Sequence, residues 1–184
     1  NSNFPYHIGD DVWGSIASAD IDLDGDIEFV VGSMDKNLYI FDKNGLDFSV
    51  LLDRYVIGTP VIGQVDGDPE LEIIIGGFGP GTSTNPLFVL NHDGSHTSGF
   101  PVQIGEKIRG GVSIADYNMN GLDDIVFGTE SDNVYLIMDN GEIADGFPFQ
   151  ASNKIESSPS ILDQNGVKII CVGSKDDHFY GISD

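Results

Sequence analysis

The sequence predicts an all-β protein: a β-propeller of four-stranded antiparallel blades, with four blades in its 184 residues. One observation is a repeat, because four related units of about 46 residues fill the chain, and this is the size of a propeller blade. A second is composition, since apolar runs are short, 24 residues are glycine, and the 3.6-residue period of amphipathic helices is weak. A four-stranded unit of this size must bury both of its faces against neighbouring units.

Each repeat contains four expected strands, and three of them carry a marker residue. The first strand leads into an acidic loop. The second ends in a glycine, at Gly32, Gly76, Gly128 and Gly173. The third carries an aromatic residue, at Tyr39, Phe88, Tyr135 and Tyr180. The fourth begins at Phe4, Phe48, Phe100 and Phe147, and we expect these four rings to occupy equivalent buried places.

The repeats divide one domain, residues 1–184, at approximately 4–47, 48–99, 100–146 and 147–184. The chain begins with the phenylalanine strand and ends after the tyrosine strand. In a closed four-bladed ring, strand Phe4–Ile8 would complete the sheet formed by Ser157–Asp184 and remove two unpaired edges. Alternatively, the four repeats are part of a larger propeller of seven or eight blades.

The charge balance excludes some partners. The chain has 30 acidic against 8 basic residues, a formal net charge of −22, which repels nucleic acid and anionic membranes. No apolar run approaches the roughly 18–20 residues of a membrane span, so we expect no membrane insertion. The single cysteine, Cys171, excludes an internal disulfide.

Acidic loops separate the first and second strands of three repeats. Their alternate residues, which we number 1, 3, 5, 7 and 9, carry oxygen, and Gly25 or Gly121 at position 6 permits a tight turn. Loop 1 contains Asp20, Asp22, Asp24, Asp26 and Glu28. Loop 2 contains Gln64, Asp66, Asp68, Glu70 and Glu72, with Pro69 at position 6. Loop 3 contains Asp116, Asn118, Asn120, Leu122 and Asp124.

This pattern suits calcium, which takes six to eight hard oxygen ligands. Crowded carboxylates repel one another unless a cation lies among them, and position 7 would contribute its backbone carbonyl. An EF-hand is excluded because its position 12 is Glu, whereas Val31 and Phe127 stand there inside strands. The fourth repeat keeps Asp163 but has Ile169, four residues before Gly173, where the other repeats have their position-9 residue four before the glycine, so we expect no ion there and two or three Ca²⁺ per chain. The alternative for each loop is a solvated acidic turn.

The loop D-x-D-x-D-G-x-x-[DE], the strand ending in glycine and the Phe-Pro before the next repeat resemble the FG-GAP repeats of integrin-α-type and VCBS-type β-propellers. The resemblance covers the whole chain. It implies calcium in the blade loops and a propeller that acts as an interaction platform. The chain departs from the family in having four repeats, because those propellers commonly have seven or eight blades.

A second candidate site lies seven and nine residues before each loop. These side chains lead into the innermost strands and would ring the mouth of the central channel, where they could bind a sugar or a peptide. They are Trp13, Tyr55, Lys107, Arg109, Lys154 and Glu156. The structural alternative is that Trp13 and Tyr55 cap the core and Arg109 pairs with Glu156.

Two functions follow from these patterns. The first is a non-catalytic calcium-binding module, secreted or at the cell surface, that binds a protein or carbohydrate ligand. The alternative is the propeller portion of a calcium-dependent polysaccharide lyase, for which Tyr55, Lys107, Arg109 and Lys154 are the candidate groups. Association with further blades or with a second chain is compatible with both functions.

Overall fold

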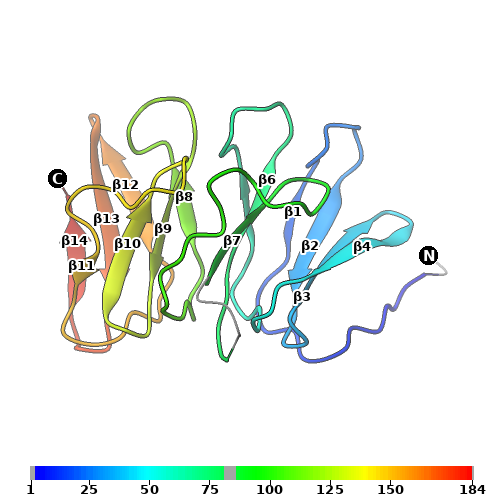
Figure 1. The fold of residues 1–184 in the computed structure, drawn as a ribbon, viewed down its shortest axis with the longest axis horizontal. Helices are drawn as coiled ribbons and strands as arrows, with labels where there is room; N and C mark the ends of the chain where they lie inside the picture. Colours follow the sequence, from blue (N-terminus) through cyan, green and yellow to red (C-terminus); the bar gives the residue numbers. More distant parts are fainter. Residues whose placement is uncertain (1–2, 81–85, 184) are drawn as a thin grey trace.

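The computed structural model describes residues 3–80 and 86–183, which form four antiparallel sheets lying side by side (Figure 1). Blade 1 contains β1 (Ala17–Ala19), β2 (Glu28–Gly32), β3 (Asn37–Asp42) and β4 (Gly45–Leu51). Blade 2 contains β5 (Val61–Gly63), β6 (Glu72–Gly76) and β7 (Leu87–Leu90). Blade 3 contains β8 (Ser113–Ala115), β9 (Asp124–Gly128), β10 (Asn133–Ile137) and β11 (Phe149–Gln150). Blade 4 contains β12 (Ser160–Gln164), β13 (Val167–Gly173) and β14 (Phe179–Ile182). The predicted all-β propeller architecture is confirmed, as a partial propeller.

The burial of each strand follows from its place in the blade. The second strands of blades 2 and 3, β6 and β9, are buried along their whole length because a neighbouring sheet covers each face. The outermost strand of blade 1, β4, alternates between inward and exposed residues because only one of its faces is covered. Apolar residues therefore concentrate in the middle strands, as the repeats predict.

Three layers of the core lie at the junctions between blades, and a smaller cluster of Val31, Tyr39 and Phe41 lies on blade 1, with Ile8 and Leu46 packed against it. Residues of β2 and β3 pack against β6 and β7, β6 and β7 pack against β9 and β10, and β9 and β10 pack against β13 and β14. The glycine that ends the second strand permits this approach. A Cβ on Gly128 would lie 2.0 Å from Cγ2 of Ile155 in the next blade, and Gly32 and Gly76 meet Val56 and Ile108 in the same way.

Of the two arrangements that the sequence left open, the closed four-bladed ring is not the one that the chain forms. Strand Phe4–Ile8 does not complete the last sheet, which contains the three strands β12, β13 and β14. Phe4 and Tyr6 instead lie on blade 1, where their rings are 6.0 and 5.3 Å from the Phe41 ring. The two termini lie at opposite ends of the molecule (Figure 1). Closure depends on the angle between blades, which the packing between sheets sets and the repeat pattern does not reveal.

The expectation that four equivalent phenylalanine rings are buried is wrong: the segments after Phe48, Phe100 and Phe147 pair with the third strand of their blades, the segment after Phe4 does not, and the four rings differ in burial. Phe100 is buried, Phe48 and Phe147 are half-buried, and Phe4 is 44% exposed. Each ring lies between the outer strand of one blade and the face of the next, so its burial depends on both. Within the described residues no blade precedes Phe4, and its ring is covered from one side.

Candidate metal centres

Loop 1 gathers three carboxylates from the two ends of its turn. One oxygen each of Asp20, Asp22 and Glu28 lie within 4.8 Å of one another. The Glu28 side chain is buried and accepts a hydrogen bond from Ile21 N–H at 2.9 Å. Asp20 accepts Gly25 N–H at 3.1 Å, where Gly25 has φ of 95°. The position-6 glycine is thus required by a left-handed backbone conformation.

Loop 2 forms a second such cluster. One oxygen each of Asp66, Asp68 and Glu72 lie within 4.8 Å of one another. Glu72 accepts Val65 N–H at 2.5 Å and is almost completely buried. The amide nitrogen of Gln64 donates to the backbone carbonyls of Asp68 and, at 3.2 Å, Glu70. In this loop a side-chain donor therefore contacts the position-7 carbonyl that the sequence assigns to the metal.

The backbone of loop 3 follows the same path as that of loop 1, but loop 3 carries fewer charged side chains. Asp116 accepts the N–H groups of Asn120 and Gly121, both at 2.9 Å, and Gly121 again has φ of 95°. Asp124 accepts Tyr117 N–H and Asp139 N–H, both at 2.9 Å. Asn118 and Asn120 supply amide oxygens where loop 1 has carboxylates. Loop 3 thus offers a ligand set with two carboxylates among its predicted ligands.

The fourth repeat replaces the loop with a two-residue hairpin turn. Asn165 and Gly166 both have positive φ, at 59° and 81°, as the type I′ turn of an Asn-Gly hairpin requires. Asp163 lies in β12 opposite Lys168 of β13, and their charged groups are 3.5 Å apart. Asp163 is therefore held by a cation of the chain itself.

Burial changes the acidity of the carboxylates at position 9. Burial raises the pKa of Glu72 to about 7, and repulsion from Asp66 and Asp68 adds to the shift against the hydrogen bonds that oppose it. Burial likewise raises the pKa of Glu28, with repulsion from Asp22 in the same direction. Burial also raises the pKa of Asp124. These groups are costly to ionise unless a cation compensates for the lost hydration.

The donor set of loop 1 fits a hard cation. The Oδ1 atom of Asp20 is buried and has no hydrogen-bond partner among the described residues. Such an atom is destabilising unless an ion or a water satisfies it. Asp22 and Asp24 each use one oxygen to accept the N–H two residues further on, which shapes the turn. An Asx turn of this kind forms with or without an ion, so Asp20 and Glu28 carry the argument for a metal.

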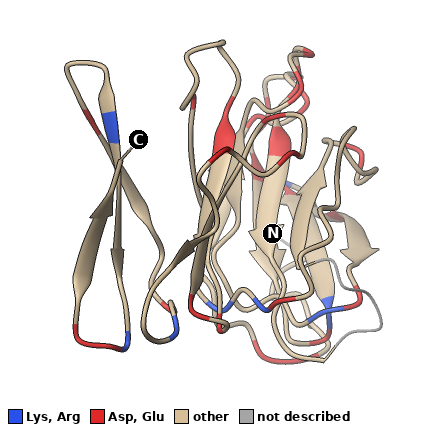
Figure 2. Cartoon of the chain, turned by 60° about the vertical axis from the view of Figure 1, so that its left-hand side comes forward, with Lys and Arg blue, Asp and Glu red and all other residues tan. Residues whose placement is uncertain are grey.

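Lys and Arg lie mostly at the end opposite loops 1, 2 and 3, whereas Asp and Glu lie at both ends of the blades (Figure 2). Two lysines lie at the loop end: Lys43, whose ammonium contacts Asp26 at position 7 of loop 1, and Lys168, which pairs with Asp163. The loop end therefore favours cations, and the opposite end is where the candidate channel residues lie.

Three of the six candidate channel residues, Arg109, Lys154 and Glu156, belong to an ion-pair network. Arg109 lies 3.7 Å from Glu130 and 3.8 Å from Glu156, and Lys154 lies 3.7 Å from Glu130. The predicted alternative pair Arg109–Glu156 thus exists. Trp13 is 60% exposed, so the expectation that it caps the core is wrong.

Tyr55 and Lys107 complete the candidate set. The Tyr55 ring lies 5.9 Å from the Lys36 ammonium of blade 1. Lys107 is exposed, and its backbone carbonyl accepts Glu130 N–H at 3.0 Å. Arg109 and Lys154, two of the four groups that the lyase alternative requires, are thus engaged in ion pairs.

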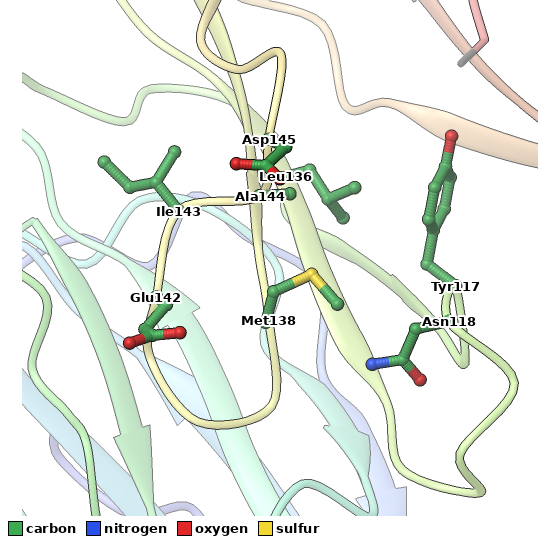
Figure 3. Close-up of a pocket in the computed structure, with 8 residues that line it drawn as sticks. All are labelled: Tyr117, Asn118, Leu136, Met138, Glu142, Ile143, Ala144 and Asp145. Carbon is green, nitrogen blue, oxygen red and sulfur yellow. The ribbon is translucent and has the colours of Figure 1, made fainter.

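A groove of about 470 Å³ adjoins loop 3 (Figure 3). Tyr117 and Asn118 form one side, and Glu142 and Ile143 from the turn after β10 form the other. The Met138 side chain lies between them (Figure 3). Sequence reasoning missed this groove, because it depends on how the turn after β10 folds beside the loop.

A repeated carboxylate–tyrosine contact was also missed. Tyr39 OH donates to Asp35, Tyr180 OH donates to Asp176 at 2.6 Å, and Tyr135 OH donates to Glu106 at 2.8 Å. The carboxylates in blades 1 and 4 also accept Gly9 N–H and Ser152 N–H, which ties the incoming segment to the blade. The recurring D-x-x-x-Y spacing of blades 1 and 4 was the available signal.

The fold and the acidic loops together define a partial β-propeller with candidate cation sites at one end of its blades. No family model and no curated protein matches the sequence. The solved structure of BBS1N in complex with ARL6DN is similar, with a TM-score of 0.73 and 10% identity over 95% of this chain and 55% of that one. The C-terminal domain of PilY1 from Pseudomonas aeruginosa has a TM-score of 0.68 and 15% identity over 92% of this chain and 48% of that one.

The V. cholerae biofilm matrix protein Bap1 has a TM-score of 0.59 and 17% identity, over 92% of this chain and 28% of that one. At such identities the likeness shows the propeller fold alone. This chain spans about half the length of the first two proteins or less. Within the described residues, no helix has the length and apolar composition needed to cross a membrane.

Proposed function

We propose that this chain is a non-catalytic, calcium-binding β-propeller of FG-GAP type, secreted or at the cell surface, that binds a protein or carbohydrate ligand. The observation that carries the proposal is the buried position-9 carboxylate of loops 1 and 2. In each loop it lies within 4.8 Å of two aspartates from the other end of the turn. A bound cation would compensate both the burial and the mutual repulsion of these groups.

Calcium is the cation that the donor set favours. The predicted ligands are carboxylate, amide and carbonyl oxygens, without His or Cys, which disfavours zinc. Their number exceeds the one or two carboxylates that typically hold magnesium. Loop 1 has the most complete set, and loops 2 and 3 would provide a second and a third ion.

The proposed location outside the cell follows from the calcium affinity expected of such loops. Calcium sites of modest affinity fill at the millimolar concentrations found outside cells. Bap1, a protein of the same fold, is a biofilm matrix protein, and the proposal places this chain in a comparable setting. The exposed side chains Trp13 and Lys107 are offered as contacts for the ligand.

The metal is tested with two asparagine variants measured by titration calorimetry. Asp22→Asn keeps the oxygen that accepts Asp24 N–H but removes a charge from the cluster, and we expect it to abolish or weaken one calcium site at least tenfold. Asp163→Asn is the matched control, because this residue already pairs with Lys168, and its calcium binding should equal that of the unmodified chain. An unmodified chain that binds no calcium, or binds zinc instead, would contradict the proposal.

The ligand is tested by a glycan array and a uronic-acid lyase assay, run together with and without calcium. We expect calcium-dependent glycan binding, or binding of a protein partner captured in parallel, and no unsaturated sugar product. Accumulation of such a product by the purified chain, lost in Tyr55→Phe, would establish the lyase alternative and overturn the non-catalytic assignment.

A further inference from the structure

The three junctions between blades share one set of contacts. The residue eight before each loop places its side chain on the glycine that ends the second strand of the preceding blade, as Ile155 does on Gly128. The N–H of the same residue donates to the carbonyl after that glycine. The pairs are Val56 to Ser33 at 3.0 Å, Ile108 to Gly77 at 3.1 Å and Ile155 to Thr129 at 3.0 Å.

The two ends of the chain carry the two missing halves of this contact. Val12 is the equivalent residue of blade 1, and it is 42% exposed. Gly173 is the equivalent glycine of blade 4, where the one atom that an added Cβ would meet is Ser157 Oγ, at 3.7 Å. Val12 is thus the kind of side chain that a following blade would place on Gly173, although the two residues belong to blades 1 and 4, which lie at opposite ends of the molecule (Figure 1).

Among the residues that the structure describes, the sheet of blade 4 has three strands, and the start of the chain could provide a fourth. In the other blades, the residue two after the phenylalanine pairs with the residue before the aromatic marker, as in Leu38–Val50, Leu87–Val102 and Val134–Phe149. The same register places Tyr6 opposite Phe179. Both rings are exposed, at 41% and 75%, and two aromatic residues paired across strands stabilise a sheet.

The polar groups at the two ends are complementary as well. Ser15 N–H donates to Thr59 of blade 2 and Gly111 N–H to Ser158 of blade 4, so Ser15 Oγ is the matching acceptor for Ser158 N–H. At the last junction Lys154 lies 3.7 Å from Glu130 of the preceding blade. The equivalent residues at the two ends are Asp11 and Lys175, which have opposite charges, and Lys175 also lies 2.7 Å from Glu156 of its own blade.

We propose that two copies of this chain associate through these ends, blade 4 of each against blade 1 of the other, and form one eight-bladed ring. Strand Phe4–Ile8 of each copy would become the fourth strand of blade 4 in the other. A second copy is the occupant that the apolar, hydrogen-bonding and charged groups named above favour, because each end is complementary to the other end and not to itself. Ser157 is an exception, because the equivalent residue of the other blades is glycine. Two such contacts related by a twofold axis close without leaving an unpaired edge.

The mass of the chain in solution is the first test, by light scattering after size-exclusion chromatography in calcium. We expect twice the 19.8 kDa of one chain. A mass of one chain across the accessible concentration range overturns the proposal. The same mass would result if the further blades came from a different polypeptide, so that arrangement also contradicts it. A ladder of larger species also overturns it, because the ring should close at two copies.

Variants at the ends distinguish this interface from any other. Gly173→Ala should leave the single chain folded, since its Cβ has room, but should weaken association at least tenfold by filling the place of Val12. Ser157→Gly should strengthen association, because the Cβ of Ser157 would crowd the blade that docks against it. The equivalent residues of the other blades are Gly14, Gly58 and Gly110, where an added Cβ would lie 2.3, 2.9 and 2.8 Å from a carbonyl oxygen of the next blade. A dimer that is insensitive to both changes uses another surface and contradicts the proposal.

A charge exchange provides a test that a folding defect cannot imitate. Asp11→Lys and Lys175→Asp should each weaken association, and the chain with both substitutions should recover it because the opposite charges face each other again. Leu51→Asp, on the outer strand of blade 1 and 70% exposed, is the control that should leave the mass unchanged. Two single variants that weaken association without recovery in the double variant overturn the assigned pairing.

Discussion

The Glu72 carboxyl group lies in the interior of blade 2, at 1% exposure, and accepts two backbone N–H groups while Asp66 and Asp68 stand nearby. A carboxylate in this place is destabilised by lost hydration and by its neighbours, and both effects raise its pKa to about 7. The same carboxylate becomes favourable when a cation binds. One residue therefore makes the stability of the blade depend on both protons and calcium.

This coupling predicts opposite responses to pH with and without calcium. In chelator, the folded chain holds the Glu72 proton up to about pH 7 whereas the unfolded chain releases it near 4.5, so this group stabilises the fold at pH 5 and the contribution is lost as pH rises through 7. The free energy of unfolding, measured in denaturant, should be larger at pH 5 than at pH 7.5 by up to about 3 kcal/mol from this residue.

In calcium the free energy of unfolding should instead be smaller at pH 5 than at pH 7.5, because acid displaces the ion. Glu72→Gln, whose side chain is neutral at both pH values, should reduce the pH dependence of stability in chelator. An unmodified chain whose stability in chelator does not change between pH 5 and pH 7.5 would show that the carboxylate is solvated.

At the scale of the strand, the glycine that ends the second strand sets how closely blades pack. Gly128 lies against Ile155 of blade 4, whereas a Cβ on Gly173, at the same place in blade 4, would make only an ordinary contact with Ser157 Oγ at 3.7 Å. The identical residue thus has different consequences in two blades because the neighbouring sheet is present in only one case. The sequence pattern alone treats the two positions as equal.

Alanine substitutions at Gly128 and Gly173 should change the free energy of unfolding by different amounts. Gly128→Ala should destabilise the chain by about 1–3 kcal/mol, because the new Cβ forces Ile155 out of its place. Gly173→Ala, measured at a concentration where the chain is monomeric, should change the free energy of unfolding by less than about 0.5 kcal/mol. Equal costs at both positions, determined by urea unfolding, would show that the junctions are packed differently from the structure.

At the scale of the whole molecule, a formal charge of −22 acts against a compact chain, and three calcium ions would reduce it to −16 (−22 + 6). The local effect is larger than the total suggests, because the charges that calcium would neutralise lie between strands that must pack. Lys and Arg lie mostly at the opposite end of the blades, so the Lys43–Asp26 pair compensates only part of this repulsion at the loop end (Figure 2).

Removal of calcium should therefore lower the melting temperature of the whole chain. An ion that binds only the folded state stabilises by about 2.7 kcal/mol per site when its concentration is a hundredfold above Kd. Thermal melting in calcium and in chelator measures the sum over the sites, and moderate salt should restore part of the loss in chelator by screening. Identical melting temperatures in both solutions would mean that the acidic loops are solvated turns.

The sequence by itself determined the repeat, the blade architecture and the acidic loops, because these depend on local features. A glycine at φ 95°, an Asn-Gly turn and a strand that is apolar on both faces are each recognisable in a short stretch. Only the tertiary structure decided whether the ring closes, which equivalent phenylalanine is buried, and where Gln64 places its amide. Those outcomes depend on the angle between sheets and on atoms brought together from distant parts of the chain. The same four repeats are compatible with several such arrangements until the sheets are packed.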